Sequence, residues 1–280
     1  MFFTGIADEA GKPIAKQIAA HQAIGWTEIE VRNVDSINLA DMPDDKFEAT
    51  FDALGQAGMH VSCFASQLGN WARPITNDFD ADESELKTAI PRMHRCNTPF
   101  IRTMSWPNDK DNPWPDAQWK AEAVRRLREL AKIAEDGGVV LVHENCSGWG
   151  GQGPEQALAL IEEIDSPAFK LVYDTGNVIG HGQDGWDYYN QVKPHIVYVH
   201  IKDRSADGKA CFAGEGLAYV REIAADLLKT GYEGGFSIEP HIAAAVHAGK
   251  EAEDERAYNI YVEYGQRFQK LMEQVQAGLQ

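Results

Sequence analysis

Residues 139–174 read VVLVHENCSGWGGQGPEQALALIEEIDSPAFKLVYD and contain one strand–helix–strand unit. VVLVHE is a short apolar run rich in β-branched residues, which predicts a buried strand. In GPEQALALIEEI the apolar residues recur three and four positions apart, which predicts an amphipathic helix. KLVYD, at the end of the segment, predicts the next strand. Two strands joined by a helix predict a parallel pair, which is the unit of α/β folds.

The same unit repeats along the whole chain. Eight apolar runs of strand length alternate with amphipathic patterns, and glycines such as Gly25 and Gly231 mark helix ends. The eight runs cover residues 2–7, 28–32, 60–65, 100–105, 139–144, 170–174, 196–201 and 235–239. Eight even units in 280 residues predict a single-domain (β/α)8 TIM barrel over residues 1–280. A doubly wound sheet rarely contains so many even units, and residues 250–280 predict a terminal helix on the outside.

Composition limits the partners that the chain can bind. The formal net charge is −17 and the pI is about 4.9, so the surface repels nucleic-acid phosphates and anionic membranes. The N-terminus lacks the pattern of a signal peptide, and the sequence contains no apolar run long enough to span a membrane. The four cysteines are far apart and form no CxxC pair, which indicates reduced thiols. We therefore expect a soluble, cytoplasmic protein with no nucleic-acid or membrane partner.

Four ionisable residues end four of the apolar runs, namely Glu144, Asp174, His200 and Glu239. In a barrel of parallel strands, these strand ends surround one mouth, so the four side chains should face one another. Each residue alone could cap a helix, form an ion pair or pack in the core. Together, three carboxylates and one imidazole indicate a divalent-metal site. Mn²⁺ fits this ligand set best, with Mg²⁺, Co²⁺ and Zn²⁺ as alternatives.

The chain resembles the xylose isomerase-like TIM-barrel superfamily, in its branch of sugar-phosphate isomerases and epimerases. The motifs that carry the resemblance are IEVRN around Glu30, VHEN at Glu144, YDTGN at Asp174, VHIKD at His200, AGEG at Gly214–Gly216, and GYEGGFSIEPH ending at His241. The resemblance implies that Glu144, Asp174, His200 and Glu239 bind a divalent metal, commonly Mn²⁺. It also implies that Glu144 and Glu239 act as the catalytic base and acid.

The resemblance implies a metal-dependent isomerase or epimerase of a sugar or sugar derivative. Such an enzyme removes an α-proton through a metal-stabilised enediolate. Returning the proton on the opposite face gives an epimer, whereas delivering it to the neighbouring carbon gives an isomer, and the sequence favours neither. Members of this branch are often dimers or tetramers, which leaves a homo-oligomer open.

Three other classes of protein can be built on this scaffold. A lyase that dehydrates a keto-polyol such as an inosose uses the same metal and the same proton removal, and it remains an alternative. A non-catalytic metal or sugar binder is a second alternative. Abasic-site endonucleases share the fold, but they need a multi-zinc cluster with more histidines and a basic face, both of which this sequence lacks.

Seven residues are candidates for contact with the substrate. Glu30 and Arg32 end the second strand, where Arg32 either binds substrate or pairs with Glu30. His143 either packs behind Glu144 or reaches the substrate. Asn177 stands where ketose 3-epimerases carry a histidine, and Lys202 shares the face of His200.

The last two candidates are tryptophans. The mouth loops carry four tryptophans, Trp71, Trp106, Trp114 and Trp149, and an indole can pack against the C–H face of a sugar. We expect Trp106 and Trp149 to make this contact.

Overall fold

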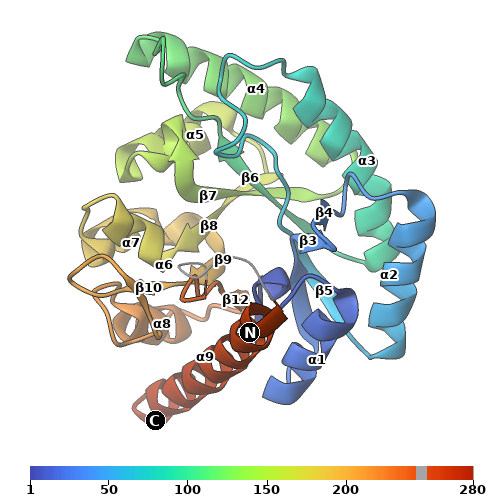
Figure 1. Ribbon diagram of the computed structural model, residues 1–280. Coiled ribbons are helices and arrows are strands. Elements are labelled where there is room, and N and C mark those ends of the chain that lie inside the picture. Colours follow the sequence, from blue (N-terminus) through green and yellow to red (C-terminus); the bar gives the residue numbers. More distant parts are fainter. Residues whose placement is uncertain (244–250, 280) are drawn as a thin grey trace.

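The computed structural model describes residues 1–243 and 251–279, which form a nearly closed barrel of parallel strands inside a ring of helices (Figure 1). The barrel strands are β1 Phe2–Gly5, β2 Glu28–Val31, β5 His60–Phe64, β6 Phe100–Ser105, β7 Val140–Gly148, β8 Phe169–Asp174, β9 Ile196–Ile201 and β12 Gly235–Ile238. Their order around the sheet is β1-β12-β9-β8-β7-β6-β5-β2. A single parallel bridge, from Ile6 to Glu30, joins the two ends of this sheet. The predicted (β/α)8 fold is confirmed.

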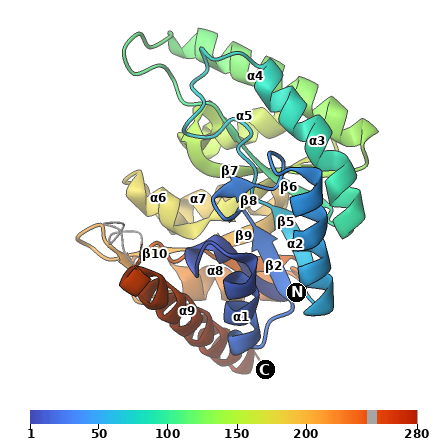
Figure 2. The ribbon, with the colours of Figure 1, turned by 45° about the vertical axis from the view of Figure 1, so that its right-hand side comes forward.

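The helices cover the outside of the barrel, as both views show (Figures 1 and 2). They are α1 Ile14–Ile24, α2 Asp44–Gln56, α3 Asp80–Cys96, α4 Asp116–Asp136, α5 Pro154–Ile164, α6 Thr175–Gly180, α7 Gly185–Val192, α8 Val220–Lys229 and α9 Glu251–Ala277. Helix α9 packs against α1 and α8. The terminal helix predicted over residues 250–280 is therefore confirmed for Glu251–Ala277, while positions 250 and 280 lie outside the described residues.

The eight predicted strands agree with the observed ones within one or two residues, except that β7 continues past Glu144 to Gly148. Two short hairpins were not expected. One pairs β3 Asn33–Val34 with β4 Ile37–Asn38, and the other pairs β10 Asp203–Arg204 with β11 Ala210–Cys211. Each begins within two residues of the C-terminal end of a barrel strand, so both hairpins build the mouth of the barrel.

Large apolar side chains fill the barrel interior below this mouth. Cys63, Val142, Val172 and Tyr198 form a buried cluster inside the ring of strands. The Tyr198 hydroxyl lies 2.9 Å from the Ser62 hydroxyl, which satisfies both polar groups. Because the interior is packed, polar chemistry is confined to the C-terminal ends of the strands.

None of the helices in the described part of the chain combines the length and the apolar character that crossing a membrane requires. All four cysteines belong to this part, and all four are free thiols, as expected.

Candidate metal centre

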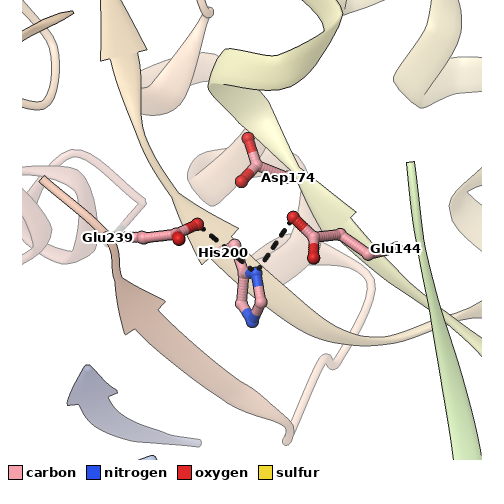
Figure 3. A group of neighbouring side chains, drawn as sticks. All are labelled: Glu144, Asp174, His200 and Glu239. Carbon is pink, nitrogen blue, oxygen red and sulfur yellow. Dashed lines mark ion pairs between the residues drawn. The ribbon is translucent and has the colours of Figure 1, made fainter. Parts of the chain in front are cut away.

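Four side chains from neighbouring strands converge at the barrel mouth (Figure 3). Glu144 lies on β7, Asp174 ends β8, His200 lies on β9, and Glu239 directly follows β12. Each offers one ligand atom, and these atoms all lie within 4.8 Å of one another. All four side chains are buried. The structure thus brings together the four residues that the sequence predicts as metal ligands, and their role as ligands stays a prediction.

One buried atom of each residue forms no hydrogen bond with any described residue. These atoms are Glu144 Oε2, Asp174 Oδ2, His200 Nδ1 and Glu239 Oε2. The three oxygens lie near buried cations, but buried polar atoms that form no hydrogen bond are uncommon in native proteins. Three carboxylate oxygens and one imidazole nitrogen form a donor set that suits a hard divalent cation. The residues present therefore fit such an ion.

The remaining atoms of these side chains are held by hydrogen bonds that fix their orientation. Asp174 Oδ1 caps helix α6 by accepting the backbone N–H groups of Gly176 at 2.9 Å and Asn177 at 2.7 Å. The Asn177 side chain also donates to Glu144 Oε1 at 3.0 Å. Orientation of this kind holds metal ligands in place and raises affinity for the ion.

Two buried cations contact the carboxylates. Lys202 Nζ lies 3.0 Å from Asp174 Oδ2 and 2.7 Å from Glu239 Oε2, within ion-pair distance but outside hydrogen-bond geometry. Arg102 Nη1 lies 3.3 Å from Glu144 Oε2. Positive charge therefore partly balances the three buried carboxylates in the protein itself.

These contacts set the protonation states of the three carboxylates. Burial raises the pKa of Glu144, but Arg102 and the nearby His200 outweigh it and lower the pKa to about 2. For Glu239, burial again acts upward, and Lys202 and His241 hold the pKa well below its usual value. Burial dominates at Asp174 and raises its pKa despite Lys202. Two of the three carboxylates are therefore firmly ionised at neutral pH.

Glu30 and Arg32 have different partners from those that the sequence suggested. Glu30 is buried, and its carboxylate contacts His200 Nε2 at 3.2 Å and accepts a hydrogen bond from Ser237. It does not line the cavity, which does not support the expected contact with substrate, and its position beside His200 would instead orient that ring. Arg32 pairs with Asp8 at 2.9 Å and with Glu239 Oε1 at 3.0 Å, and not with Glu30.

A cavity of about 1110 Å³ adjoins the cluster of four side chains. Its walls include Glu144 and Glu239 together with three of the predicted substrate-binding residues, Arg32, Asn177 and Lys202. These three are placed where a substrate could reach them, and their contact with substrate stays a prediction.

Trp106, Trp149 and His143 are buried and lie outside the cavity walls. The Trp106 indole N–H donates to Asp82 at 2.8 Å, and that of Trp149 donates to Asp116 at 3.0 Å. His143 packs against Phe169, and burial lowers its pKa to about 4. Their burial away from the cavity walls does not support the expected contact with substrate, which stays a prediction. A tryptophan in a mouth loop can pack its large indole against the surrounding helices instead of the cavity. The position of the residue in the sequence does not show which of the two directions the indole takes.

Sequence reasoning missed other residues of the cavity. Arg102, His241 and the exposed Trp71 all line it. Arg102 had a readable signal, because a charged residue inside the apolar strand FIRTMS must find a buried partner. His241 follows Glu239 in SIEPH and lies 3.0 Å from its Oε1.

Comparison with known proteins gives partial matches to curated enzymes. The chain is 26% identical over 143 residues to an inosose dehydratase of Geobacillus thermodenitrificans, covering 51% of this chain and 48% of that protein. It is 33% identical over 108 residues to a 2-epi-5-epi-valiolone 7-phosphate 2-epimerase of Actinoplanes sp., covering 38% of each protein. The chain thus spans about half or less of the length of the curated relatives that it matches.

The fold is shared more widely than the sequence. A crystal structure of the probable 3-DHS dehydratase from Bacillus anthracis matches with a TM-score of 0.73 at 16% identity, covering 96% of this chain and 99% of that one. The family model described as the xylose isomerase-like TIM barrel matches residues 18–259. Because this match covers most of the sequence and agrees with the observed barrel, the chain belongs to the xylose isomerase-like TIM-barrel family.

Proposed function

We propose that this protein is a divalent-metal-dependent isomerase or epimerase of a sugar or sugar derivative, which removes a proton from the carbon beside a carbonyl group. The observation that carries the proposal is the convergence of four buried donor atoms, within 4.8 Å of one another, in a cluster of which two members, Glu144 and Glu239, line a large cavity. The similarity to a 2-epimerase and to inosose dehydratases supports a carbonyl substrate of the sugar class.

Glu144, Asp174, His200 and Glu239 would hold the ion, and we propose Mn²⁺. A bound divalent ion acts as a Lewis acid that stabilises negative charge developing on substrate oxygens. The oxygen-rich ligand set with one imidazole supports this choice of metal.

Glu144 and Glu239 are the proposed acid–base pair. Both line the cavity, and both have a pKa lowered by neighbouring cations, so each is ionised as a base must be. They stand on strands β7 and β12, on either side of Asp174 and His200, so they flank the centre. One carboxylate removes the α-proton. The protonated carboxylate that results can return this proton to the neighbouring carbon, which gives an isomer, whereas an epimer requires the second carboxylate to take up a proton from solvent and deliver it to the opposite face.

The residues around this pair would position the substrate. Asn177 and Lys202 line the cavity next to Glu144 and Glu239, and their amide and ammonium groups suit sugar hydroxyl and carbonyl oxygens. Arg32 lines the cavity while it pairs with Asp8 and Glu239, so a substrate oxygen would share its guanidinium with these carboxylates.

A lyase that dehydrates a keto-polyol is the second candidate. It is favoured by the match to inosose dehydratases, and it begins with the same removal of an α-proton. The reaction then differs in one step only, because hydroxide leaves from the next carbon instead of a proton returning.

The test is proton exchange in D₂O with Mn²⁺-loaded protein and a panel of ketoses, aldoses and inososes, followed by ¹H NMR. Wild type should introduce deuterium at one carbon of at least one substrate. Glu239→Gln should lose roughly 10²–10⁴-fold in rate, which is the usual contribution of an acid–base residue. Glu233→Gln, which changes an exposed carboxylate shortly before β12, should match wild type.

The products separate the two candidates. An epimer or isomer would identify the first, whereas a new ultraviolet-absorbing enone would identify the lyase. Exchange that continues at the wild-type rate in Glu239→Gln would contradict both.

A further inference from the structure

Trp71 is the most exposed large apolar side chain among the described residues, and it stands on the wall of the cavity. Its side chain is 72% exposed. The other exposed large apolar residues, Met1, Leu217 and Tyr219, do not line the cavity. A lone apolar residue on an outer surface needs no explanation. An indole exposed inside a substrate cavity indicates a ligand that covers it.

The loop that carries Trp71 is held by hydrogen bonds on both sides. Before it, the backbone N–H of Gln67 donates to Glu85 at 2.8 Å, and that of Gly69 donates to Asp82 at 3.0 Å. After it, Arg73 pairs with Asp82 at 2.7 Å and with Glu85 at 2.6 Å. The indole is therefore presented by a fixed backbone, as preorganised binding requires.

Contacts link this loop to the candidate metal centre. Arg102 pairs with Glu144 and also donates to the backbone oxygen of Ser66 at 3.2 Å. The loop follows β5, which is four strands from β9 in either direction around the eight-stranded barrel. Trp71 thus belongs to the side of the mouth opposite His200, and one cavity includes both sides.

The cavity is larger than one sugar ring needs. Pockets of roughly 300–1,000 Å³ enclose drug-sized ligands. A cavity of about 1110 Å³ exceeds that range, whereas a monosaccharide is much smaller than a drug-sized ligand. Amide side chains line the space on the side of Trp71, namely Asn33, Asn38, Gln67 and Asn70. An indole face with amides around it suits the C–H face and the hydroxyl groups of a sugar.

We propose that the substrate is a disaccharide, whose second sugar ring stacks on Trp71 while the first ring reacts at the candidate metal centre. The proposal rests on the proposed function, since it assigns the substrate class of the same site. It makes Trp71 a specificity-determining residue.

Titration calorimetry of the Mn²⁺-loaded protein tests the proposal without requiring turnover. The probes are cellobiose, maltose, lactose and sucrose, compared with glucose, galactose and fructose. At least one disaccharide should bind roughly tenfold more tightly than its component monosaccharides, as expected for one aromatic stacking contact. Trp71→Ala should lose this difference, and Trp71→Phe should keep most of it. Leu217→Ala, which removes an exposed apolar residue outside the cavity, should bind like wild type.

Equal affinity for disaccharides and monosaccharides would overturn the proposal, and so would a disaccharide preference that survives in Trp71→Ala. Gel filtration of the same variants measures their oligomeric state and can also contradict the proposal. A changed oligomeric state in Trp71→Ala with unchanged disaccharide affinity would mean that Trp71 covers a subunit contact. Proton exchange by wild type distinguishes a failure of the disaccharide proposal from a failure of the proposed function. If exchange into a monosaccharide occurs without any disaccharide preference, the second-ring site is refuted and the proposed function stands.

Discussion

Nε2 of His200 lies 3.2 Å from Oε1 of Glu30, a contact between strands β9 and β2, which are not neighbours in the barrel. With Nε2 engaged, Nδ1 is the nitrogen left to face Glu144 at 3.7 Å and Glu239 at 4.0 Å (Figure 3). A carboxylate behind a ligating histidine fixes the orientation of the ring and increases its basicity. We therefore expect Glu30 to support the centre from behind His200.

Replacing Glu30 with Gln should weaken Mn²⁺ binding about 10–100-fold, because the charge that supports His200 is lost. Competition with a metal-sensitive dye would give the affinity. Glu28→Gln is the matched control, since it changes a half-buried carboxylate at the other end of the same strand. Equal Mn²⁺ affinity in Glu30→Gln and wild type would show that Glu30 has no such role.

Lys202 should stabilise the protein most when metal is absent. Its ammonium balances Asp174 and Glu239, and removing one partner of a buried ion pair costs about 3–5 kcal/mol. In EDTA, Lys202→Met should therefore lower the melting temperature by roughly 10 °C. Adding Mn²⁺ should raise the melting temperature more in this variant than in wild type, because the ion supplies the missing positive charge.

Differential scanning calorimetry with and without Mn²⁺ makes this comparison. Lys209→Met, which breaks an exposed pair with Asp207, should melt like wild type under both conditions. If Lys202→Met in EDTA is as stable as wild type, Lys202 does not balance these carboxylates.

The protein should lose stability as the pH falls from about 6.5 to about 4, in part through His21. This side chain is buried between the Glu28 carbonyl and the Tyr261 hydroxyl, and burial lowers its pKa to about 4. Between these pH values the unfolded chain binds a proton at His21 and the folded chain does not. The free energy of unfolding should therefore fall by up to about 3 kcal/mol from this residue.

Urea denaturation at intervals of pH would measure this loss. His21→Gln should show a shallower decline over the same range, although it is less stable at pH 7. Parallel stability curves for the variant and wild type would exclude His21 as a source of the pH dependence.

Trp149 should contribute to stability and not to substrate binding. Trp149→Phe removes the hydrogen bond to Asp116 and should cost about 1 kcal/mol, while leaving the KM for substrate unchanged. Urea denaturation and steady-state kinetics check the two parts. A KM that rises several-fold in the variant would indicate that Trp149 does contact substrate.

The sequence was enough to predict the barrel and the cluster of four side chains. Strand ends in a parallel barrel meet at one mouth, so the positions of Glu144 and His200 along the chain fix their neighbours in space. The same reasoning placed Lys202 on the face of His200, and the two side chains do share the centre.

Loop residues were not predictable in the same way. Trp71, Trp106 and Trp149 all lie in loops that follow barrel strands at the mouth, but of these three only Trp71 lines the cavity. The orientation of each indole depends on distant partners such as Asp82 and Asp116, which no local pattern reveals. Arg32 likewise pairs with Asp8 and Glu239, which adjoin strands β1 and β12. Both partners are distant from Arg32 in the sequence.

The most direct measurement is the Mn²⁺ content of wild type and of Asp174→Asn, taken by elemental analysis after dialysis against a low concentration of the metal. The account predicts one ion per chain in wild type and almost none in Asp174→Asn, in which the capping side chain remains but the charged ligand is lost. A wild-type protein that retains no divalent ion, or a variant that retains as much as wild type, would contradict the metal centre and the chemistry proposed for it.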